Sequence, residues 1–528
     1  MRIRRLEINN YRGIKSAIWM PTADLVCLIG PGDSTKTTLL DAISLALTPR
    51  FSIELTDVDF HNCDLSEPIK IEVVVSDVPE KLLSFDKLGG FVCGVNADGE
   101  VLPDPEESSE KALAIRFTAD QSLEPIWEVH KPFSDLEPKR LSAANRAVFG
   151  LFRVDERVDA HMRWTRGSAL STLTGGTSQA ESASTTAMRA AREAVFGLDD
   201  PQLIEAASLV GSRALKFGAS NYENLRPGID PVSMSSGHAL TLHEDKIPLT
   251  RQGLGTRRLT SLAIQDARVD GASIILIDEI ELGLEPHRLH RLVRLLHDRV
   301  KVGGAQVIMT THSPLVVEQL DVSSLALVRN AGGITSIKAV PSTLDGLDSG
   351  AMQKMVRSGP SAMLASRVIV VEGATEMGLL RAFCEAWDAE CDQKGREPLA
   401  VIGTAVRNGG SDKEALKRGE CLALLGFDIM IVVDHDNILE KEEKKAAEAG
   451  AEVVRWETGN HLEAQIAADI PADQLYRLID LVAELTSEES VLASIAARLP
   501  SRPGRLSSTD PREWPGRLVP LRRRRHRP

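Results

Sequence analysis

Short apolar runs alternate with amphipathic stretches near the start of the chain. From Ile3 to Ile8 apolar and polar residues alternate, and Leu25 to Ile29 is a continuous apolar run of the kind found in buried strands. This run leads into a glycine-rich turn and a helical pattern from Lys36 to Leu47, and a further strand is predicted from Ile69 to Val75. The alternation of strands and helices predicts an α/β fold.

This alternation is interrupted once and then restarts twice along the chain. Residues 131–230 are helix-rich, except for a Ser/Thr/Gly-rich stretch from Ser168 to Thr185 that we expect to be an exposed loop. We therefore predict one α/β domain in two pieces, a helical insertion between them, a second α/β domain and a basic, disordered tail. Their bounds, in that order, are residues 1–130 with 231–345, 131–230, 365–500 and 501–528.

Length and composition narrow the class of protein. With 528 residues, 43% of them hydrophobic and 26% charged, the chain has room for about three domains and the composition of a globular protein. The formal charge of −13 argues against a protein that coats nucleic acid with its whole surface, but it allows a local basic groove. Because every apolar run is shorter than a membrane-spanning helix and the N-terminus does not resemble a signal peptide, we expect no membrane association and a cytoplasmic location.

A nucleotide site is predicted at the turn that follows Ile29. The segment Gly30-Pro31-Gly32-Asp33-Ser34-Thr35-Lys36-Thr37 follows a buried strand and opens a helix, which is the context of a phosphate-binding loop. Lys36 would reach the β- and γ-phosphates of ATP, and the Thr37 hydroxyl would bind Mg²⁺. Thr35 stands where such loops usually have glycine. The predicted ATP-binding residues of the turn are Gly30, Gly32, Ser34, Thr35, Lys36 and Thr37. On this motif alone, a glycine-rich turn that merely starts a helix is the alternative.

Three downstream segments support the nucleotide site by their order and by their position at strand ends. One apolar strand ends in Asp278, which would hold Mg²⁺ through water, and Glu279, which would orient or deprotonate the attacking water. The next leads to His312, which would lie beside the γ-phosphate. Gly253 and Gly255 precede a helix whose N-terminus would face a phosphate across a dimer. Together these segments predict an ATPase.

The two outer pieces resemble the cassette ATPases of the structural-maintenance and recombination type. Members commonly begin with a strand that carries an aromatic-Arg-Gly turn, here Tyr11-Arg12-Gly13, and the segment from Asp278 to Pro286 is similar to the turn that follows their catalytic strand. In that family two ATPase heads sandwich ATP. The resemblance therefore implies a homodimer or higher homo-oligomer that forms through the ATPase and the helical insertion.

Carboxylates follow the strands of the C-terminal α/β unit. Glu372 and Asp434 each end a buried apolar run, Glu376 lies one helical turn after Glu372, Asp436 lies two residues after Asp434, and Glu463 follows a third strand-like stretch. Ligands of open α/β sheets collect at such strand ends. Because the six cysteines have no Cys-x-x-Cys spacing, a catalytic metal would be bound by carboxylates, which favour Mg²⁺ or Mn²⁺. An ordinary helix-capping role remains an alternative for Asp436 or Glu463.

The Glu-Gly turn at Glu372 and the Asp-x-Asp strand end at Asp434 resemble the Toprim fold. A two-piece ATPase followed by a Toprim domain resembles the OLD (overcoming lysogenisation defect) family of ATP-dependent nucleases, a group that includes the nuclease subunit of the Gabija anti-phage system. The family usually also has a lysine near the end of the Toprim domain, whereas no lysine follows Lys445 here, so either an arginine such as Arg512 or Arg517 replaces it or this end of the domain is altered. By this resemblance two Mg²⁺ or Mn²⁺ ions are bound by Glu372, Glu376, Asp434, Asp436 and Glu463, and the catalytic residues are Glu279, His312, Glu372 and Asp434.

The resemblance implies an ATP-hydrolysing, divalent-metal-dependent DNA endonuclease. Its cofactors would be ATP and Mg²⁺ or Mn²⁺, its substrate DNA, and its role anti-phage defence or DNA processing, with a partner defence protein. One alternative is a non-cleaving DNA-binding ATPase whose Toprim unit is only a scaffold. Another is a Toprim topoisomerase or primase, although Tyr11, Tyr222 and Tyr476 are not in obvious nucleophile sites and the cysteines supply no zinc module.

Overall fold

A computed structural model describes most of the chain up to residue 498. The described residues are 1–49, 53–84, 87–155, 158–163, 170, 173, 195, 199–219, 222–229, 240–267, 273–303, 305–344, 347–434, 439–457 and 459–498. The predictions for Asp436, for the tail at 501–528 and for nearly all of the loop from Ser168 to Thr185 lie outside these residues. No helix in the described ranges combines the length and the apolar character needed to cross a membrane.

Fourteen strands of the described chain form one large mixed sheet. At one end of it lie five parallel strands, in the order β10-β14-β15-β3-β16. Because parallel strands end at the same edge of a sheet, the segments that follow β3, β14 and β15 lie together. The bounds are β3 (Leu25–Ile29), β10 (Leu151–Val154), β14 (Ser273–Ile277), β15 (Ala305–Thr310) and β16 (Leu325–Ala331).

The rest of the large sheet is antiparallel, apart from the parallel pair β17 and β2. The order continues from β16 as β17-β2-β1-β4-β7-β5-β6, and β8 and β9 extend it from β7. These strands are β1 (Arg2–Tyr11), β2 (Ile14–Trp19), β4 (Ile69–Ser76), β5 (Val92–Val95), β6 (Val101–Leu102), β7 (Glu110–Ala119), β8 (Ile126–His130), β9 (Lys139–Arg140) and β17 (Ile334–Ala339). The short helix α2 (Glu80–Leu83) lies in the connection from β4 to β5.

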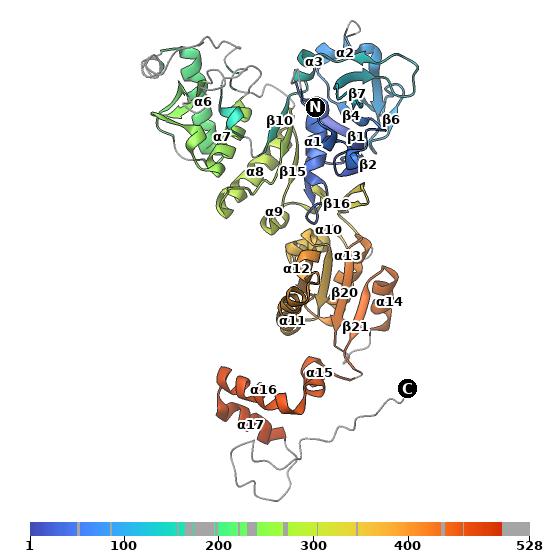
Figure 1. Ribbon diagram of the computed structural model, residues 1–528, viewed down its shortest axis with the longest axis vertical. Coiled ribbons are helices and arrows are strands. Elements are labelled where there is room, and N and C mark those ends of the chain that lie inside the picture. The colour runs from blue at the N-terminus through green and yellow to red at the C-terminus, as the bar shows by residue number, and fades with distance from the viewer. Residues whose placement is uncertain are drawn as a thin grey trace, which may run out of the picture.

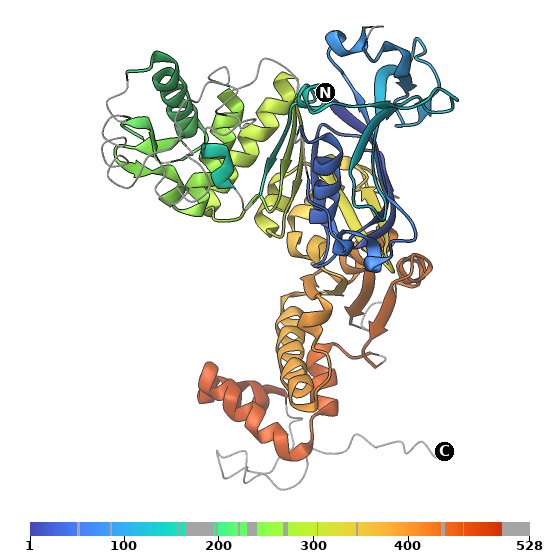
Figure 2. The ribbon, with the colours of Figure 1, turned by 45° about the horizontal axis from the view of Figure 1, so that its top comes forward.

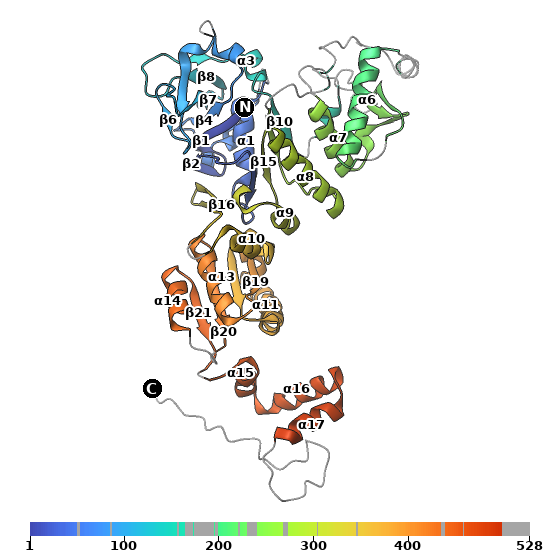
Figure 3. The same ribbon diagram turned by 180° about the vertical axis from the view of Figure 1, so that it is seen from behind.

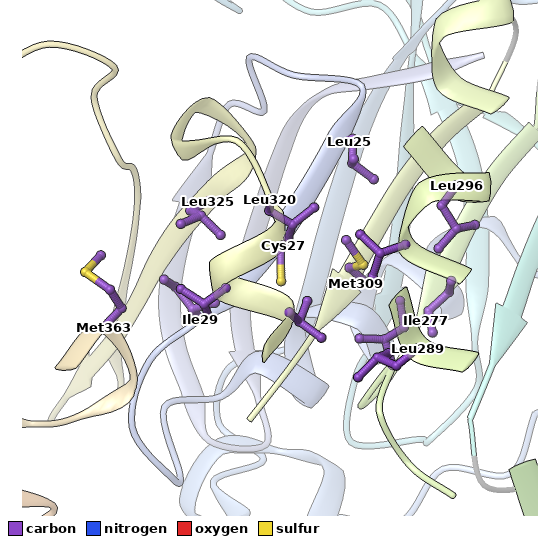
Figure 4. Close-up of a cluster of buried hydrophobic side chains, with 14 of the residues drawn as sticks. Leu25, Cys27, Ile29, Ile277, Leu289, Leu296, Met309, Leu320, Leu325 and Met363 are labelled. Carbon is purple, nitrogen blue, oxygen red and sulfur yellow. The ribbon is translucent and has the colours of Figure 1, made fainter. Parts of the chain in front are cut away.

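Helices bury both faces of the parallel half of the sheet. Val26 and Leu28 of β3 belong to the same buried cluster as Leu39 and Leu40 of α1 (Lys36–Leu47). The alternate residues of β3 pack with α8 (Pro286–Val302) and α9 (Pro314–Gln319) on the other face, where Figure 4 shows Leu25, Cys27, Ile29, Leu289, Leu296 and Leu320. This double burial explains why β3 reads as a continuous apolar run. It also fixes the start of α1, and with it the turn from Gly30 to Thr35.

The insertion lies beside the large sheet and carries α6 and α7 (Figures 1 and 2). We expected a helical insertion over residues 131–230, but β10 still pairs with β14 of the large sheet because Phe152 and Val154 are buried there. The insertion also holds a separate antiparallel sheet, β11-β12-β13, so it is not purely helical. Its elements and the helices that lead into it are α3 (Ala143–Ala147), α6 (Pro201–Lys216), β11 (Leu225–Ile229), β12 (Leu240–Glu244), β13 (Ile247–Pro248) and α7 (Leu254–Ala267).

The C-terminal unit is a second α/β layer structure below the large sheet in Figures 1 and 2. Its four strands are parallel, in the order β19-β18-β20-β21. The strands are β18 (Arg367–Val371), β19 (Thr404–Asn408), β20 (Asp428–Val433) and β21 (Glu452–Arg455). The helices are α10 (Ser349–Arg357), α11 (Ala374–Lys394), α12 (Leu399–Ile402), α13 (Asp412–Leu424), α14 (Glu440–Glu448), α15 (Leu462–Asp469), α16 (Ala472–Leu485) and α17 (Glu488–Arg498). The predicted α/β class is confirmed.

The large sheet and the C-terminal unit are joined by packing as well as by the chain. The Arg329 guanidinium of β16 lies 4.5 Å from the centre of the Phe427 ring, just before β20. Arg407 of β19 is buried and donates to the Met355 carbonyl and, at 2.8 Å, to the Ser358 hydroxyl. Burial lowers the pKa of Arg407 to about 10. The start of β20 is therefore held against β16 of the large sheet, and β19 is held against α10 within the C-terminal unit.

A buried ion network on the antiparallel part of the sheet yields a pH-dependent stability prediction. Glu72 of β4 is 7% exposed, and its Oε2 lies 2.8 Å from His130 Nε2 and 3.3 Å from an Arg116 nitrogen. Burial alone would raise the pKa of Glu72, but the hydrogen bond from His130 and the charges of His130 and Arg116 outweigh it and lower the pKa to about 2. The ionised carboxylate therefore stabilises the fold above its ordinary pKa, and this contribution is lost as the pH falls toward 2.

We expect Glu72→Gln to lower the free energy of unfolding by about 2–3 kcal/mol at neutral pH. The difference from wild type should shrink to roughly half by about pH 3, because Glu72 then binds a proton in the unfolded state while it stays mostly ionised in the folded state. Urea titrations at both pH values measure it. Glu7→Gln is the control, because Glu7 is more exposed and its ion pair with Arg5 at 2.8 Å is worth under about 1 kcal/mol. A pH-independent loss for Glu72→Gln would contradict the account.

Candidate functional site

The turn after β3 closes around the Lys36 ammonium. Lys36 begins α1, is 4% exposed, and donates from Nζ to the carbonyls of Pro31 at 2.7 Å and Gly30 at 3.1 Å and to Ser34 Oγ at 3.1 Å. Burial lowers the pKa of Lys36 to about 8, against the opposing charge of Asp278. The Lys36 ammonium is therefore a buried cation that is bound by two carbonyls of the turn and the Ser34 hydroxyl. Phosphate oxygens of a ligand could replace these acceptors.

Thr35 adopts the backbone conformation that glycine normally supplies in such a turn. Its φ is +69°, which is costly for a β-branched residue. Its hydroxyl donates to the Ser34 carbonyl at 2.6 Å and lies 3.0 Å from the hydroxyl of Thr335 on β17. Asn330 braces Thr335 with a hydrogen bond of 2.8 Å. The surrounding strands therefore hold Thr35 in its strained conformation.

Asp278 stands at the centre of the polar contacts beyond this turn. Its Oδ1 accepts from Thr37 Oγ1 at 3.1 Å and from Thr310 Oγ1 at 2.7 Å, so the ends of β3, β14 and β15 meet at one carboxylate. Glu279 has a φ of +46° and donates its backbone N–H to Thr310 Oγ1 at 2.7 Å. Arg258 of α7 donates to the Asp278 and Glu279 carbonyls at 2.5 and 2.9 Å. The predicted pair of Asp278 and Thr37 is thus brought together.

His312 lies at the predicted strand end, and a carboxylate of another segment fixes its backbone. Glu281 accepts the His312 backbone N–H at 2.6 Å and the Thr311 hydroxyl at 2.6 Å. The His312 side chain is exposed. These hydrogen bonds link the segments that follow β14 and β15, and they leave the His312 imidazole facing solvent, where a ligand could reach it.

Two arginines at this edge were not predicted from the sequence. Arg153 of β10 forms ion pairs with Asp41 of α1 and, at 3.8 Å, with Asp278. Arg12 pairs with the same Asp41 and, at 2.8 Å, with Asp59. The Arg-Gly turn at Arg12 was a usable signal, but Arg153 offered none, because its position depends on β10 entering the sheet from beside a long insertion. Together they tie α1 to the end of β14.

Gly253 and Gly255 occupy different environments at the start of α7. A Cβ atom on Gly255 would lie 2.0 Å from the carbonyl oxygen of Gly283, whereas a Cβ on Gly253 would have nothing within 4 Å. Gly283 has a φ of +75°, so this turn requires glycine on both sides of the contact. The glycine at 255 therefore has a packing role within one chain, and the predicted phosphate contact across a dimer stays a prediction.

This contact gives a prediction with a matched control. We expect Gly255→Ala to lower the free energy of unfolding by about 2 kcal/mol or more, because two backbone segments must separate to admit one methyl group. Gly253→Ala, two residues away, should change it by less than about 0.5 kcal/mol. Urea denaturation of both variants measures the difference, and equal stabilities would show that the contact between Gly255 and Gly283 is looser than described.

A pair of carboxylates lies at the ends of two adjacent strands of the C-terminal unit. Glu372 follows β18, and its Oε2 accepts the backbone N–H of Asp434, which follows β20, at 3.1 Å. Asp434 Oδ1 accepts from the Trp456 indole at 2.8 Å, and Arg455 of β21 donates to the Asp434 carbonyl. The predicted pair of Glu372 and Asp434 is thus brought together by the parallel sheet.

Of the other predicted metal ligands, Glu376 is buried and Glu463 is exposed. Glu376 lies in the first turn of α11, is 9% exposed, and points back so that a Cβ on Gly373 would be 2.8 Å from its Oε2. Glu463 lies in the first turn of α15, is exposed, and contacts His461 at 2.9 Å. In the ranges that the structure describes, no three His, Cys, Asp or Glu side chains are close enough to hold a metal ion, and Asp436 is not among them. Carboxylate oxygens suit a hard divalent ion, and Gly373 leaves the space that Glu376 occupies.

Comparison with known proteins finds a matching family model and similar proteins. Residues 25–318 match the family model described as "AAA domain, putative AbiEii toxin, Type IV TA system". The chain is 24% identical over 477 residues to the OLD nuclease of Thermus scotoductus, covering 84% of each protein, which confirms the resemblance predicted from the motifs. A stretch of 85 residues, 16% of this chain and 15% of the relative, is 36% identical to the Retron Ec83 probable ATPase of Escherichia coli.

Solved structures of SMC head domains also match. The SMC head domain from Thermotoga maritima is 13% identical, with a TM-score of 0.33, covering 65% of this chain and 100% of that one. The SmcHead bound to the C-winged helix domain of ScpA is 14% identical, with a TM-score of 0.39, covering 64% of this chain and 97% of that one.

Proposed function

The chain belongs to the family described as "AAA domain, putative AbiEii toxin, Type IV TA system", and we propose that it is an ATP-hydrolysing, divalent-metal-dependent DNA endonuclease. The observation that carries the proposal is the pair of Glu372 and Asp434 at adjacent strand ends of a unit separate from the phosphate-binding turn. The similarity to an OLD nuclease over most of both chains supports the combination of the two sites.

In the proposed ATPase site, each strand end contributes one function. Lys36 and the backbone N–H groups of Gly30 to Thr35 bind the phosphates, and Thr37 and Asp278 hold Mg²⁺. Glu279 orients the attacking water, and His312 faces the γ-phosphate. The exposed start of α7 at Gly253 completes the site of a second copy, which makes the active form a homodimer or higher homo-oligomer. The bonds among Thr37, Asp278 and Thr310 support this arrangement.

In the proposed nuclease site, Glu372, Glu376 and Asp434 would hold Mg²⁺ or Mn²⁺ together with Asp436 and Glu463, and the described side chains would have to draw closer together around the ion. The bound metal supplies the Lewis acid that stabilises charge on the phosphodiester. The fold of this unit supports a Toprim assignment through its parallel sheet, its Glu-Gly turn and its buried Glu376. Trp456 and Arg455 fix the orientation of Asp434 from the neighbouring strand. We further propose a role in anti-phage defence or DNA processing, with a partner defence protein.

Incubation of the purified protein with supercoiled plasmid tests the proposal. We expect nicked and then linear DNA in Mg²⁺ or Mn²⁺, none in EDTA, and release of phosphate when ATP is present. A ladder of topoisomers would favour a topoisomerase instead. ATP hydrolysis with intact plasmid under every metal condition would favour a non-cleaving DNA-binding ATPase and contradict the proposal.

A further inference from the structure

A groove on the surface of the large sheet domain is lined by basic side chains that neither proposed site uses. It encloses about 490 Å³ between α8 and the segment around the end of α9. Its lining holds two arginines and three histidines but one carboxylate, in a chain whose formal charge is −13. The polar lining residues are His287, His290, Arg291, Arg294, His297, Gln319 and Asp321. With neutral histidines, the two arginines outnumber the one carboxylate in this lining, whereas the chain as a whole is acidic.

The sequence of α8 separates this basic face from an apolar one. Leu289, Leu292, Val293 and Leu296 are buried against the sheet. The lining residues at positions 287, 290, 291, 294 and 297 recur at spacings of three and four, so they share one face of the helix opposite the buried one. This face extends for about 15 Å, the length of about four base pairs of duplex DNA. Its extent suits a run of phosphates rather than a single ion.

Two of the lining groups lack the partners that a purely structural role would give them. Arg294 is exposed, and no acidic group lies within 4.0 Å of it in the described part of the chain. The side-chain nitrogen of Gln319 is buried and has no hydrogen-bond partner among the described residues. A buried donor without an acceptor is unfavourable, so this side chain would gain a hydrogen bond by turning toward an acceptor in the groove.

The arginines of α8 that lie outside the groove form ion pairs with carboxylates, unlike Arg294 within it. Arg288 pairs with Glu285 at 3.3 Å, and Arg299 pairs with Asp266. Arg291 donates from Nε to the Lys216 carbonyl at 2.5 Å, which fixes its stem but leaves the rest of its charged guanidinium at the groove. At the far end, Asp321 and Asp298 lie 3.9 and 4.0 Å from His297, so the positive face runs from His287 to Arg294.

We propose that this groove binds the phosphodiester backbone of DNA, at a site separate from the nuclease carboxylates. The inference rests on the proposed function for its choice of polyanion. Arg291 and Arg294 contact the phosphates, Gln319 turns to donate to a phosphate oxygen, and the imidazoles of His287 and His290 line the groove beside them. In Figures 1 and 3, α8 and α9 lie above the C-terminal unit, with α9 nearer to it.

Binding of a fluorescent 30-base-pair duplex in EDTA tests the groove without cleavage. We expect Arg291→Ala/Arg294→Ala to bind at least about tenfold more weakly, with a salt dependence of log K reduced by about two. Arg288→Ala is the matched control on the same helix and should bind like wild type. Because Arg291 also contacts Lys216, Arg294→Glu alone should give a similar loss with unchanged thermal stability.

The possible outcomes separate the groove from the nuclease proposal. Equal loss for Arg288→Ala and the groove variants, or no loss for either, overturns the groove. It is also overturned if poly-glutamate competes as well as DNA at equal charge, because the groove would then take an acidic polypeptide. Groove-dependent binding without any cleavage supports the groove and contradicts the nuclease. If the protein cleaves DNA but the groove variants bind DNA as wild type does, the nuclease proposal is supported and the groove proposal is contradicted.

Discussion

Lys36→Ala is expected to lower ATP turnover by at least about 100-fold. The ammonium of Lys36 is the cation at the centre of the turn, and its three present acceptors, two carbonyls and the Ser34 hydroxyl, are groups that phosphate oxygens would replace. Lys36 is the first residue of α1, so the helix fixes its position relative to the turn. The release of inorganic phosphate measures the effect.

A loss of turnover in Lys36→Ala must be distinguished from a loss of folding, because the side chain is buried. The thermal melting of the variant and its DNA binding serve as controls, and both should stay close to wild type. Lys36→Arg keeps the positive charge, but a guanidinium cannot contact the same three acceptors as a compact ammonium. Relative to Lys36→Ala, it should therefore restore ATP binding more than ATP turnover. Wild-type turnover in Lys36→Ala would contradict the assignment of the turn.

Glu372→Ala is expected to lower metal-dependent DNA cleavage by about 1000-fold while ATP turnover stays within about twofold of wild type. Glu372 supplies a carboxylate at the end of β18 and also accepts the Asp434 backbone N–H across to β20. Its removal therefore takes away a proposed metal ligand and the contact that aligns the second one. The rate at which supercoiled plasmid becomes nicked measures the loss.

Two further variants separate charge from architecture at this site. Glu372→Gln keeps an oxygen that can accept the Asp434 N–H, so it should preserve the alignment of β18 and β20 but still lose cleavage. Glu385→Ala removes an exposed carboxylate of α11 in the same unit and should cleave like wild type. Cleavage by Glu372→Gln at the wild-type rate would show that Glu372 acts only as a structural link.

The elements that were predictable from sequence are those whose burial leaves a simple pattern. The helix predicted from Lys36 to Leu47 and the strand predicted from Leu25 to Ile29 match α1 and β3, because both faces of β3 are covered by helices. The edge strand β10 was missed because it is four residues long and is paired with β14 across more than a hundred intervening residues. Local periodicity carries no information on that pairing.

The site shows the same division between local and long-range information. Strand-end acids such as Asp278 and Asp434 could be named, because parallel strands bring their C-terminal ends together. The ion pairs of Arg153 and the packing of Gly255 on Gly283 depend on contacts between distant segments, so their roles could not be read from the sequence. A glycine at the start of a helix can allow either a phosphate or another backbone segment to approach closely. The sequence around Gly255 predicts a phosphate site, and only the fold shows that Gly255 packs on Gly283.

The measurement that tests the central claim most directly is conversion of supercoiled plasmid by wild-type protein in Mn²⁺, with Glu372→Ala purified in parallel. The account predicts nicked and linear DNA with wild type, none after addition of EDTA, and none with Glu372→Ala although that variant still hydrolyses ATP. Intact plasmid with active wild-type ATPase, or equal cleavage by Glu372→Ala, would contradict the claim that this chain joins an ATPase to a carboxylate nuclease.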